Sequence, residues 1–245
     1  MQYHTKRMDH VEKITRVMEV LCRDKATYSL RDLERLTGIP KSTLHRLLTS
    51  LEKQEWVYKD ASTGSFRPGI RFFLLNNRSC FYQELIGKAQ EQMENLVKQT
   101  GKTCLMCVLE GSVGLCIHSV EPPYPVKYVA HKGMAIPLYA GASGKVLLAF
   151  CNESLRRKIL TEGLPPKVDR KELLAQLEAI REKGYAFSRE EWIPHAGDIS
   201  APIFDRKGNF VAQIGVAGLA TSFEGREDEI AKMVKEAAKN IGCSI

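Results

Sequence analysis

The N-terminal fold is decided by one stretch, LTGIPKSTLHRLLTSL, which spans residues 36–51. Gly38 ends a helix here, because glycine adopts the left-handed conformation that follows a helix without steric penalty. Pro40 suits the first position of the next helix, where its missing N–H has no partner to lose. Leucines at 44, 47, 48 and 51 then recur at helical spacing and form one apolar stripe. We predict two helices joined by a three-residue turn, the second centred on residues 40–53.

The face opposite this stripe is polar and carries no acidic residue between positions 41 and 51. Its side chains are cations or short hydrogen-bonding groups, the kinds that contact phosphates and base edges in a DNA groove. A helix that is merely polar on its solvent side is the alternative, and such helices are common. The absence of acid favours DNA, and we predict contacts from Lys41, Ser42, Thr43, His45, Arg46 and Thr49.

One further helix is expected before this pair, and the first helix of the pair has a start signal of its own. An apolar stripe at helical spacing predicts a helix over residues 9–23. Ser29 and Asp32 have the spacing of a capping box, which marks the start of the short helix that Gly38 ends.

A hairpin is expected downstream. Residues 55–59 and 65–67 are β-prone and flank the glycine-containing turn 60–64. Pro68 lacks an N–H and is expected to shorten the second strand. The order helix, helix, turn, helix, hairpin is that of a winged helix-turn-helix. We therefore predict a DNA-binding domain over residues 1–76, whose wing contributes Lys59 and Arg67 to phosphate contacts.

The positive charge of the chain is concentrated in this first part. Of a net charge of +7, residues 1–75 contribute 14 Lys and Arg against 9 Asp and Glu, and the remainder 22 against 20. Such a segment suits a polyanion, although a solvated basic face with no partner has the same composition. The 7 cysteines are scattered, which favours reduced thiols over a disulfide framework. Apolar runs fall short of the roughly 18 residues that span a bilayer, so we expect a cytoplasmic protein without a membrane partner.

The rest of the chain predicts a linker helix and a mixed second domain. An apolar stripe predicts a long helix within residues 77–100, suited to join two domains or to pair with its copy in a dimer. Strands and helices then mix in a domain over residues 101–245, which indicates an α+β two-domain fold with an antiparallel sheet. Expected strands are 103–109, 113–120, 127–130, 197–204 and 210–217, and expected helices are 142–150, 153–160, 169–183 and 226–241.

Five segments, in this order, match those of one known family. They are LTGIPKSTLHRLL (36–48), PLYAGASGKVLLAF (137–150), GYAFSREE (184–191), ISAPIFD (199–205) and IGVAG (214–218). On these segments the chain resembles the IclR (isocitrate lyase regulator) family of bacterial transcription factors over nearly its whole length. The resemblance implies a double-stranded DNA operator, a GAF-like C-terminal domain that binds a small-metabolite effector, and a homodimer or a dimer of dimers. Members of the family repress or activate transcription.

The resemblance also implies a pocket between the loop that enters the helix at 142 and the facing strands. The N–H groups of Ala142 and Ser143 at the start of that helix suit an anionic or carbonyl oxygen. Alternatively, Ser143 only caps its own helix. The positions that the family pocket suggests as effector contacts are Tyr128, His131, Ile136, Ala142, Ser143, Ser188, Asp198, Gly215 and Ala217.

Four of these positions depart from the family members that bind small acids. Those members carry an acidic residue near Ser188, a cysteine at Asp198 and serines at Gly215 and Ala217. This chain has therefore lost two hydroxyls and moved a carboxylate. The departures imply a roomier pocket that suits a larger neutral or hydroxyl-rich ligand.

A metal or redox site is a competing interpretation of the cysteines. Cys104 and Cys107 are three residues apart, with Cys116 and His118 nearby. Residues three apart on a strand point to opposite faces, so one ion is hard to reach from both cysteines. Buried structural thiols are the expectation, with no metal and no cofactor.

Catalysis is the other competing interpretation. The segment 141–145 reads GASGK, which lacks the first glycine and the final Ser or Thr of a phosphate loop. An enzyme would have to combine Cys116 or Ser143 with a histidine and an acid, and nothing in the spacing brings such residues together. The histidines and acids available are His118, His131, His195, Glu190 and Glu191. We expect no catalytic residues.

Overall fold

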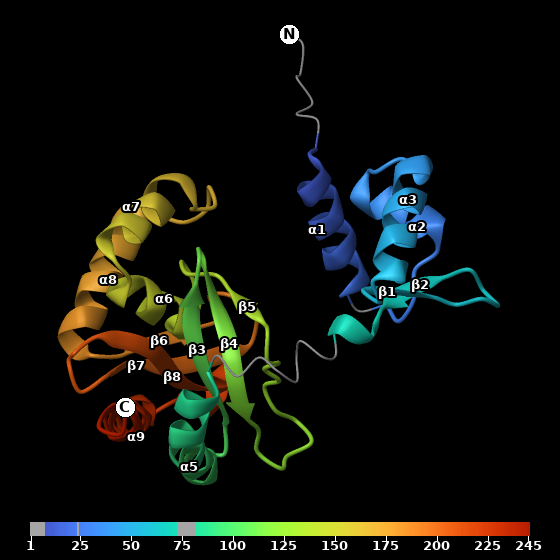
Figure 1. The fold of residues 1–245 in the computed structure, drawn as a ribbon. Helices are drawn as coiled ribbons and strands as arrows, with labels where there is room; N and C mark the ends of the chain where they lie inside the picture. The colour runs from blue at the N-terminus through green and yellow to red at the C-terminus, as the bar shows by residue number, and fades with distance from the viewer. Residues whose placement is uncertain (1–7, 24, 73–81) are drawn as a thin grey trace. The chain divides into compact units, whose positions relative to one another are not determined.

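The computed structural model describes residues 8–23, 25–72 and 82–245, and divides the chain into two compact units after Phe81. Each unit folds around its own core (Figure 1). The predicted start of the linker helix at 77–81 lies outside the described residues. Within the part of the chain that the structure describes, no helix is both long and apolar enough to cross a membrane.

The first unit has the predicted order of elements. Its helices are α1 (His10–Leu21), α2 (Leu30–Thr37) and α3 (Lys41–Lys53), followed by the strands β1 (Val57–Lys59) and β2 (Phe66–Pro68). Ser29 and Asp32 form the predicted capping box at the start of α2, and Gly38 ends α2 with a φ of 71°. Pro40 occupies the N-cap position of α3 rather than its first helical position. The leucine stripe of α3 packs against α1, α2 and the hairpin in one apolar cluster.

The hairpin is a short antiparallel pair. Tyr58 lies opposite Arg67, and the second strand ends at Pro68 as predicted. The Asp60 carboxylate accepts hydrogen bonds from the N–H groups of Ser62 and Thr63, at 2.8 and 3.0 Å, and so closes the turn. This local bonding holds the tip of the wing without help from the rest of the unit.

The second unit is a six-stranded antiparallel sheet in the order β5-β4-β3-β8-β7-β6. Helices α5 and α9 pack on one face, and α6, α7 and α8 cover the other (Figure 1). The strands are β3 (Thr103–Glu110), β4 (Val113–Val120), β5 (Ala135–Ile136), β6 (Ala186–Arg189), β7 (Ala196–Phe204) and β8 (Phe210–Leu219). The helices are α5 (Gln83–Thr100), α6 (Gly141–Phe150), α7 (Glu153–Glu162), α8 (Arg170–Lys183) and α9 (Glu227–Gly242), with a short 3-10 turn η1 (Ala220–Phe223).

One expectation for this unit needs correction. The strand expected over 127–130 is irregular, and the edge of the sheet is instead formed by β5. Side-chain hydroxyls hold the irregular segment: Thr103 donates to the carbonyl of Tyr128, and Ser119 to that of Ala130 at 2.7 Å. The helix expected as a linker is α5, and its apolar stripe packs into the core of the second unit together with α9.

Candidate functional site

Helix α3 presents the predicted polar face to solvent. Its four leucines are buried, whereas Lys41, Ser42, His45 and Arg46 are exposed. Thr43 and Thr49 are half-buried at the margins of that face. The face therefore offers two cations, an imidazole and several hydroxyls on one rigid element.

One acidic side chain approaches this helix from outside it. The N–H of Lys41 donates to Oε1 of Glu34 on α2 at 3.2 Å, and the Lys41 Nζ lies 3.6 Å from Oε2 of the same carboxylate. The two side chains are 50% and 40% exposed, so the ion pair is one of the weak surface kind. Glu34 was not predicted from the sequence as a neighbour of α3, because it lies on the preceding helix, before the acid-free stretch begins.

The wing carries its two predicted cations at the surface. Lys59 and Arg67 are both exposed. The guanidinium of Arg67 lies over the ring of Tyr58, with its central carbon 4.1 Å from the ring centroid. This cation–π contact orients the guanidinium at little cost in mobility. The first unit thus combines an exposed polar helix face with a cationic hairpin.

The second unit holds a hollow of about 400 Å³, part of it open to solvent, between the sheet and the start of α6. Six of the predicted contacts line it: Tyr128, Ile136, Ser143, Ser188, Asp198 and Ala217. The sequence analysis missed the other lining residues, which are Leu105, Gly141, Glu191, Trp192, Ile193, Ala196 and Gly197. Glu191, Trp192 and Ile193 belong to the segment between β6 and β7, for which the sequence carries no periodic signal.

Three predicted contacts lie outside the hollow. His131 is exposed in a turn closed by the N–H of Met134, which donates to the His131 carbonyl at 3.0 Å. Ala142 is buried and takes part only through its backbone. Gly215 faces Ser200 of the adjacent strand, and a Cβ added at Gly215 would lie 2.1 Å from the Ser200 Oγ. The expectation of extra room at Gly215 is therefore wrong, because Ser200 already fills it.

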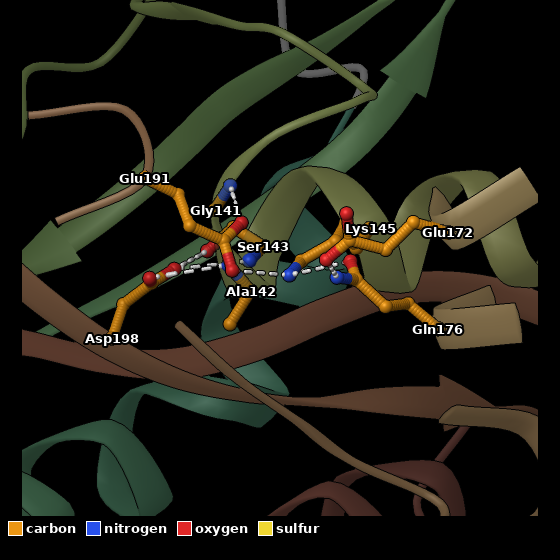
Figure 2. Close-up of polar contacts among 8 residues, drawn as sticks. All are labelled: Gly141, Ala142, Ser143, Lys145, Glu172, Gln176, Glu191 and Asp198. Atoms are coloured by element: carbon orange, nitrogen blue, oxygen red, sulfur yellow. Dashed lines mark hydrogen bonds and ion pairs between the residues drawn. The ribbon is translucent and has the colours of Figure 1, made fainter. Parts of the chain in front are cut away.

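The start of α6 is occupied by a carboxylate of the chain itself. Asp198 on β7 accepts hydrogen bonds from the N–H of Ala142 at 3.1 Å and from the N–H of Ser143 at 3.0 Å (Figure 2). The expectation that these N–H groups are free is wrong. Ser143 does not cap its own helix either: it is the third residue of α6, and its Oγ lies 3.3 Å from Asp198 and 3.0 Å from the Ser200 Oγ.

A second carboxylate completes this arrangement. Glu191 accepts from the N–H of Gly141 at 3.2 Å, and its other oxygen lies 2.6 Å from the Nζ of Lys145 (Figure 2). Lys145 is buried and also donates to Gln176 on α8 at 3.2 Å. The first three N–H groups of α6 are thus satisfied by two side chains from one neighbouring part of the chain, which is how a buried helix end avoids unpaired donors.

The electrostatics of the hollow follow from these contacts. Burial raises the pKa of Asp198, and the N–H groups of Ser143 and Ala142 oppose that rise by stabilising the charged form. The side chain lies deep in the protein, with its remaining surface on the hollow. Burial and the nearby Asp198 charge raise the pKa of Tyr128 to about 12. Its phenol is therefore a neutral hydroxyl at physiological pH.

The cysteines divide between the two faces of the sheet, as predicted. Cys104 packs with the α5 and α9 cluster, and Cys107 packs with Cys116 under α6. All three are buried, and burial raises the pKa of Cys104 and Cys107. Across residues 8–23, 25–72 and 82–245, no three His, Cys, Asp or Glu side chains come together as a set of metal ligands.

The groups considered for catalysis are dispersed or already engaged. His118 lies 2.7 Å from Gln90 of α5, on the side of the sheet opposite Ser143. Glu190 follows β6 with a φ of 57° and is exposed, so Glu190 and Glu191 lie in a turn and not on a strand. Glu191 itself is paired with Lys145. The geometry offers a ligand hollow and no arrangement of nucleophile, base and acid.

Two family models match the chain, one in each unit. Residues 10–61 match the IclR helix-turn-helix domain, and residues 80–243 match the C-terminal domain of bacterial transcriptional regulator IclR. The match covers most of both units. It also spans α3, the wing strand β1 and all lining residues of the hollow.

Curated relatives agree in length as well as in sequence. The HTH-type transcriptional regulator KipR of Bacillus subtilis is 28% identical over 228 residues, which cover 90% of this chain and 91% of KipR. The HTH-type transcriptional repressor AllR of Escherichia coli K12 is 27% identical over 242 residues, covering 96% of this chain and 89% of AllR. These relatives are regulators of transcription and not enzymes.

Solved structures share the fold. An IclR transcriptional regulator from Alicyclobacillus acidocaldarius has a TM-score of 0.78 and 27% identity, covering 95% of this chain and 96% of its own. An IclR homologue from Microbacterium hydrocarbonoxydans, solved in complex with 4-hydroxybenzoate, has a TM-score of 0.79 and 23% identity, covering 94% and 96%.

Proposed function

The chain belongs to the IclR family of bacterial transcriptional regulators, and we propose that it binds a double-stranded operator through α3 and the wing. A small molecule in the hollow of the second unit would adjust that binding. The observation that carries the DNA-binding half is the exposed face of α3, which is cationic and carries no acid between residues 41 and 51. Such a face is complementary to phosphates and to the acceptor-rich edge of guanine in the major groove.

Each predicted residue has a place in this proposal. Arg46 and His45 lie mid-helix and exposed, where side chains reach base edges. Lys41 lies at the start of α3, and Lys59 and Arg67 lie on the wing, so these three are assigned to phosphate oxygens. Ser42, Thr43 and Thr49 complete the polar face with short hydrogen-bonding groups.

The effector half rests on the hollow and on the relatives. The hollow has a mainly apolar lining with a few polar groups that converge on one end, which is the composition of small-molecule sites. The relative from Microbacterium hydrocarbonoxydans holds 4-hydroxybenzoate, which supports a small-molecule ligand for a GAF-like domain of this fold. We further propose a homodimer or a dimer of dimers, since two copies would match a two-fold symmetric operator. A protein that acts on chromosomal DNA works in the cytoplasm.

The DNA-binding half is tested by fluorescence anisotropy with duplexes that tile the DNA flanking the gene of this protein. At fixed salt, Arg46→Ala should weaken binding to the tightest duplex by about 1–3 kcal/mol, the usual worth of a bidentate contact to guanine. Arg157→Ala is the matched control, because it removes the same charge from the exposed side of α7 in the other unit.

Two further observations complete the test. Lys59→Ala should weaken binding to all duplexes alike and lower the slope of log affinity against log salt by about 1, as expected for one phosphate contact. Unchanged affinity for Arg46→Ala, or an equal loss in Arg157→Ala, would contradict the assignment of α3 to the operator.

A further inference from the structure

The hollow has an acidic lining. Among its described lining residues, Glu191 and Asp198 are the charged ones, and both are acids. Lys145 is the nearby cation, but it is buried, paired with Glu191 at 2.6 Å, and outside the lining. An anion that entered the hollow would meet the Asp198 carboxylate without a compensating cation. Like charges placed together in this way weaken binding.

The donors that would hold an anion are already used. The helix N-terminus is the natural anion site of the hollow, and its N–H groups at Gly141, Ala142 and Ser143 donate to Glu191 and Asp198. Asp198 therefore stands where the head group of an acidic ligand would bind. The contact is long-range, from the half-buried Asp198 on β7 to the buried N–H groups of Ala142 and Ser143 on α6, so solvent has only partial access to it.

The remaining lining indicates the body of the ligand. Leu105, Ile136 and Ala217 contribute apolar side chains to the lining, and Tyr128 and Trp192 contribute aromatic rings. The hydroxyls of Ser143 and Ser188 also line the hollow, next to Asp198. The site thus pairs an apolar region with a head-group region whose charged groups are acceptors.

We propose that the hollow binds a small molecule with an apolar or aromatic body and a neutral or cationic hydrogen-bond-donating head group, and that Asp198 excludes carboxylates by occupying their binding site. This inference rests on the proposed role of the hollow as an effector site. It names the class of ligand and the residue that sets it. The donor head group meets the carboxylate of Asp198 and the two serine hydroxyls.

Three probes of one size test the inference: 4-hydroxybenzoate, 4-hydroxybenzamide and 4-hydroxybenzylamine. They share the ring and differ in a head group that is anionic, neutral or cationic at pH 7. Binding is measured by calorimetry on the full chain. The wild type should bind the amide or the amine at least about tenfold more tightly than the carboxylate, given the cost of like charges.

The variant Asp198→Ser frees the N–H groups of Ala142 and Ser143 and leaves space for a ligand carboxylate. It should bind 4-hydroxybenzoate at least about tenfold more tightly than the wild type does, because charge-assisted bonds to the helix end replace the internal ones. Asp228→Ser is the matched control: it removes one acid from the exposed side of α9, on the opposite face of the sheet, and should keep the wild-type order.

A second variant keeps more of the native hydrogen bonding, in case Asp198→Ser does not fold. Asp198→Asn retains one acceptor oxygen for α6 and removes the charge, so it should bind the amine more weakly relative to the amide than the wild type does. Circular dichroism and the melting temperature establish that each variant is folded.

Three binding results would overturn the inference. The inference is overturned if wild type binds 4-hydroxybenzoate as tightly as Asp198→Ser does, or if the carboxylate outranks both other probes on the wild type. Failure of Asp198→Ser to bind the carboxylate also overturns it. Operator affinity measured with each bound probe tests the proposed function separately: an affinity that no bound probe changes would contradict effector control and leave the ligand class standing.

Discussion

Helices α3 and α6 have similar N-termini, but we assign α3 to an exposed DNA contact and the start of α6 to an internal carboxylate. Neither has an acid in its first turn, and each receives a carboxylate from another element at its N-terminus. At α3 this is Glu34, which is 40% exposed and comes from the preceding helix. At α6 it is Asp198, which comes from β7, a strand distant in sequence, and is half-buried between sheet and helix. An exposed carboxylate gives way to an incoming phosphate, whereas an enclosed one becomes part of the site.

The largest difference should appear in stability. Asp198→Ala leaves the N–H groups of Ala142 and Ser143 enclosed without an acceptor, and should destabilise the second unit by about 2–4 kcal/mol. Glu34→Ala removes a surface contact and should cost the first unit less than about 1 kcal/mol. The chain has one tryptophan in each unit, Trp56 and Trp192, so urea unfolding followed in Trp56→Phe and Trp192→Phe backgrounds reports the two units separately.

Equal losses of unfolding free energy in Asp198→Ala and Glu34→Ala would contradict this expectation. They would show that burial does not set the strength of these contacts. A loss in the Trp56 signal of Asp198→Ala would do the same, because the effect is expected to stay within the second unit.

A smaller change in stability is expected at Gln213, a buried polar side chain of the same unit. Gln213 is fully buried on β8, and among the described residues its amide makes no hydrogen bond of ordinary geometry, only a weak contact with the thiol of Cys107 opposite it on β3. An enclosed polar group without partners costs about 1–3 kcal/mol. Gln213→Met keeps the length of the side chain and should raise the stability of the second unit by about 1 kcal/mol or more.

Gln92→Met on α5 is its control, because Gln92 is half-buried and its Oε1 accepts a hydrogen bond from the Asn240 amide at 3.3 Å. A destabilised Gln213→Met would mean that the amide has a partner in solution, and that enclosed polar groups of this unit are better satisfied than the described contacts indicate.

The smallest effect is expected in DNA binding. Glu34→Gln removes the carboxylate that competes with phosphate for Lys41, and should tighten operator binding by up to about 1 kcal/mol, the range of an exposed ion pair. Glu19→Gln makes the same charge change on the exposed side of α1. If both variants tighten binding equally, the gain comes from net charge and not from the release of Lys41.

Local sequence patterns predicted most of the fold. The leucine stripe of α3, the capping box at Ser29 and the left-handed Gly38 are all properties of neighbouring residues, and the structure places them as predicted. The segment 127–130 was wrongly predicted as a strand, because its β-prone residues are held by two side-chain hydroxyls and not by a ladder.

The candidate site was harder to predict because its partners are distant in sequence. The sequence does show an unsatisfied helix start at Ala142, but not that Asp198, 56 residues away, satisfies it. It shows a glycine at 215, but not that Ser200 of the next strand fills the space. Glu34 was missed for the same reason on a shorter scale, since its contact crosses a turn. Hydrogen bonds between residues that are far apart in the chain produce no periodic pattern in the sequence.

The central claim, that the carboxylate at α3 is displaceable and the one at α6 is not, is tested most directly by backbone amide NMR. The resonances of Lys41, Ala142 and Ser143 would be followed while inorganic phosphate is added at constant ionic strength. We predict that the Lys41 amide shifts progressively as phosphate replaces Glu34, and that the Ala142 and Ser143 amides stay in place. Shifts of Ala142 and Ser143 at the same phosphate concentrations would contradict the account.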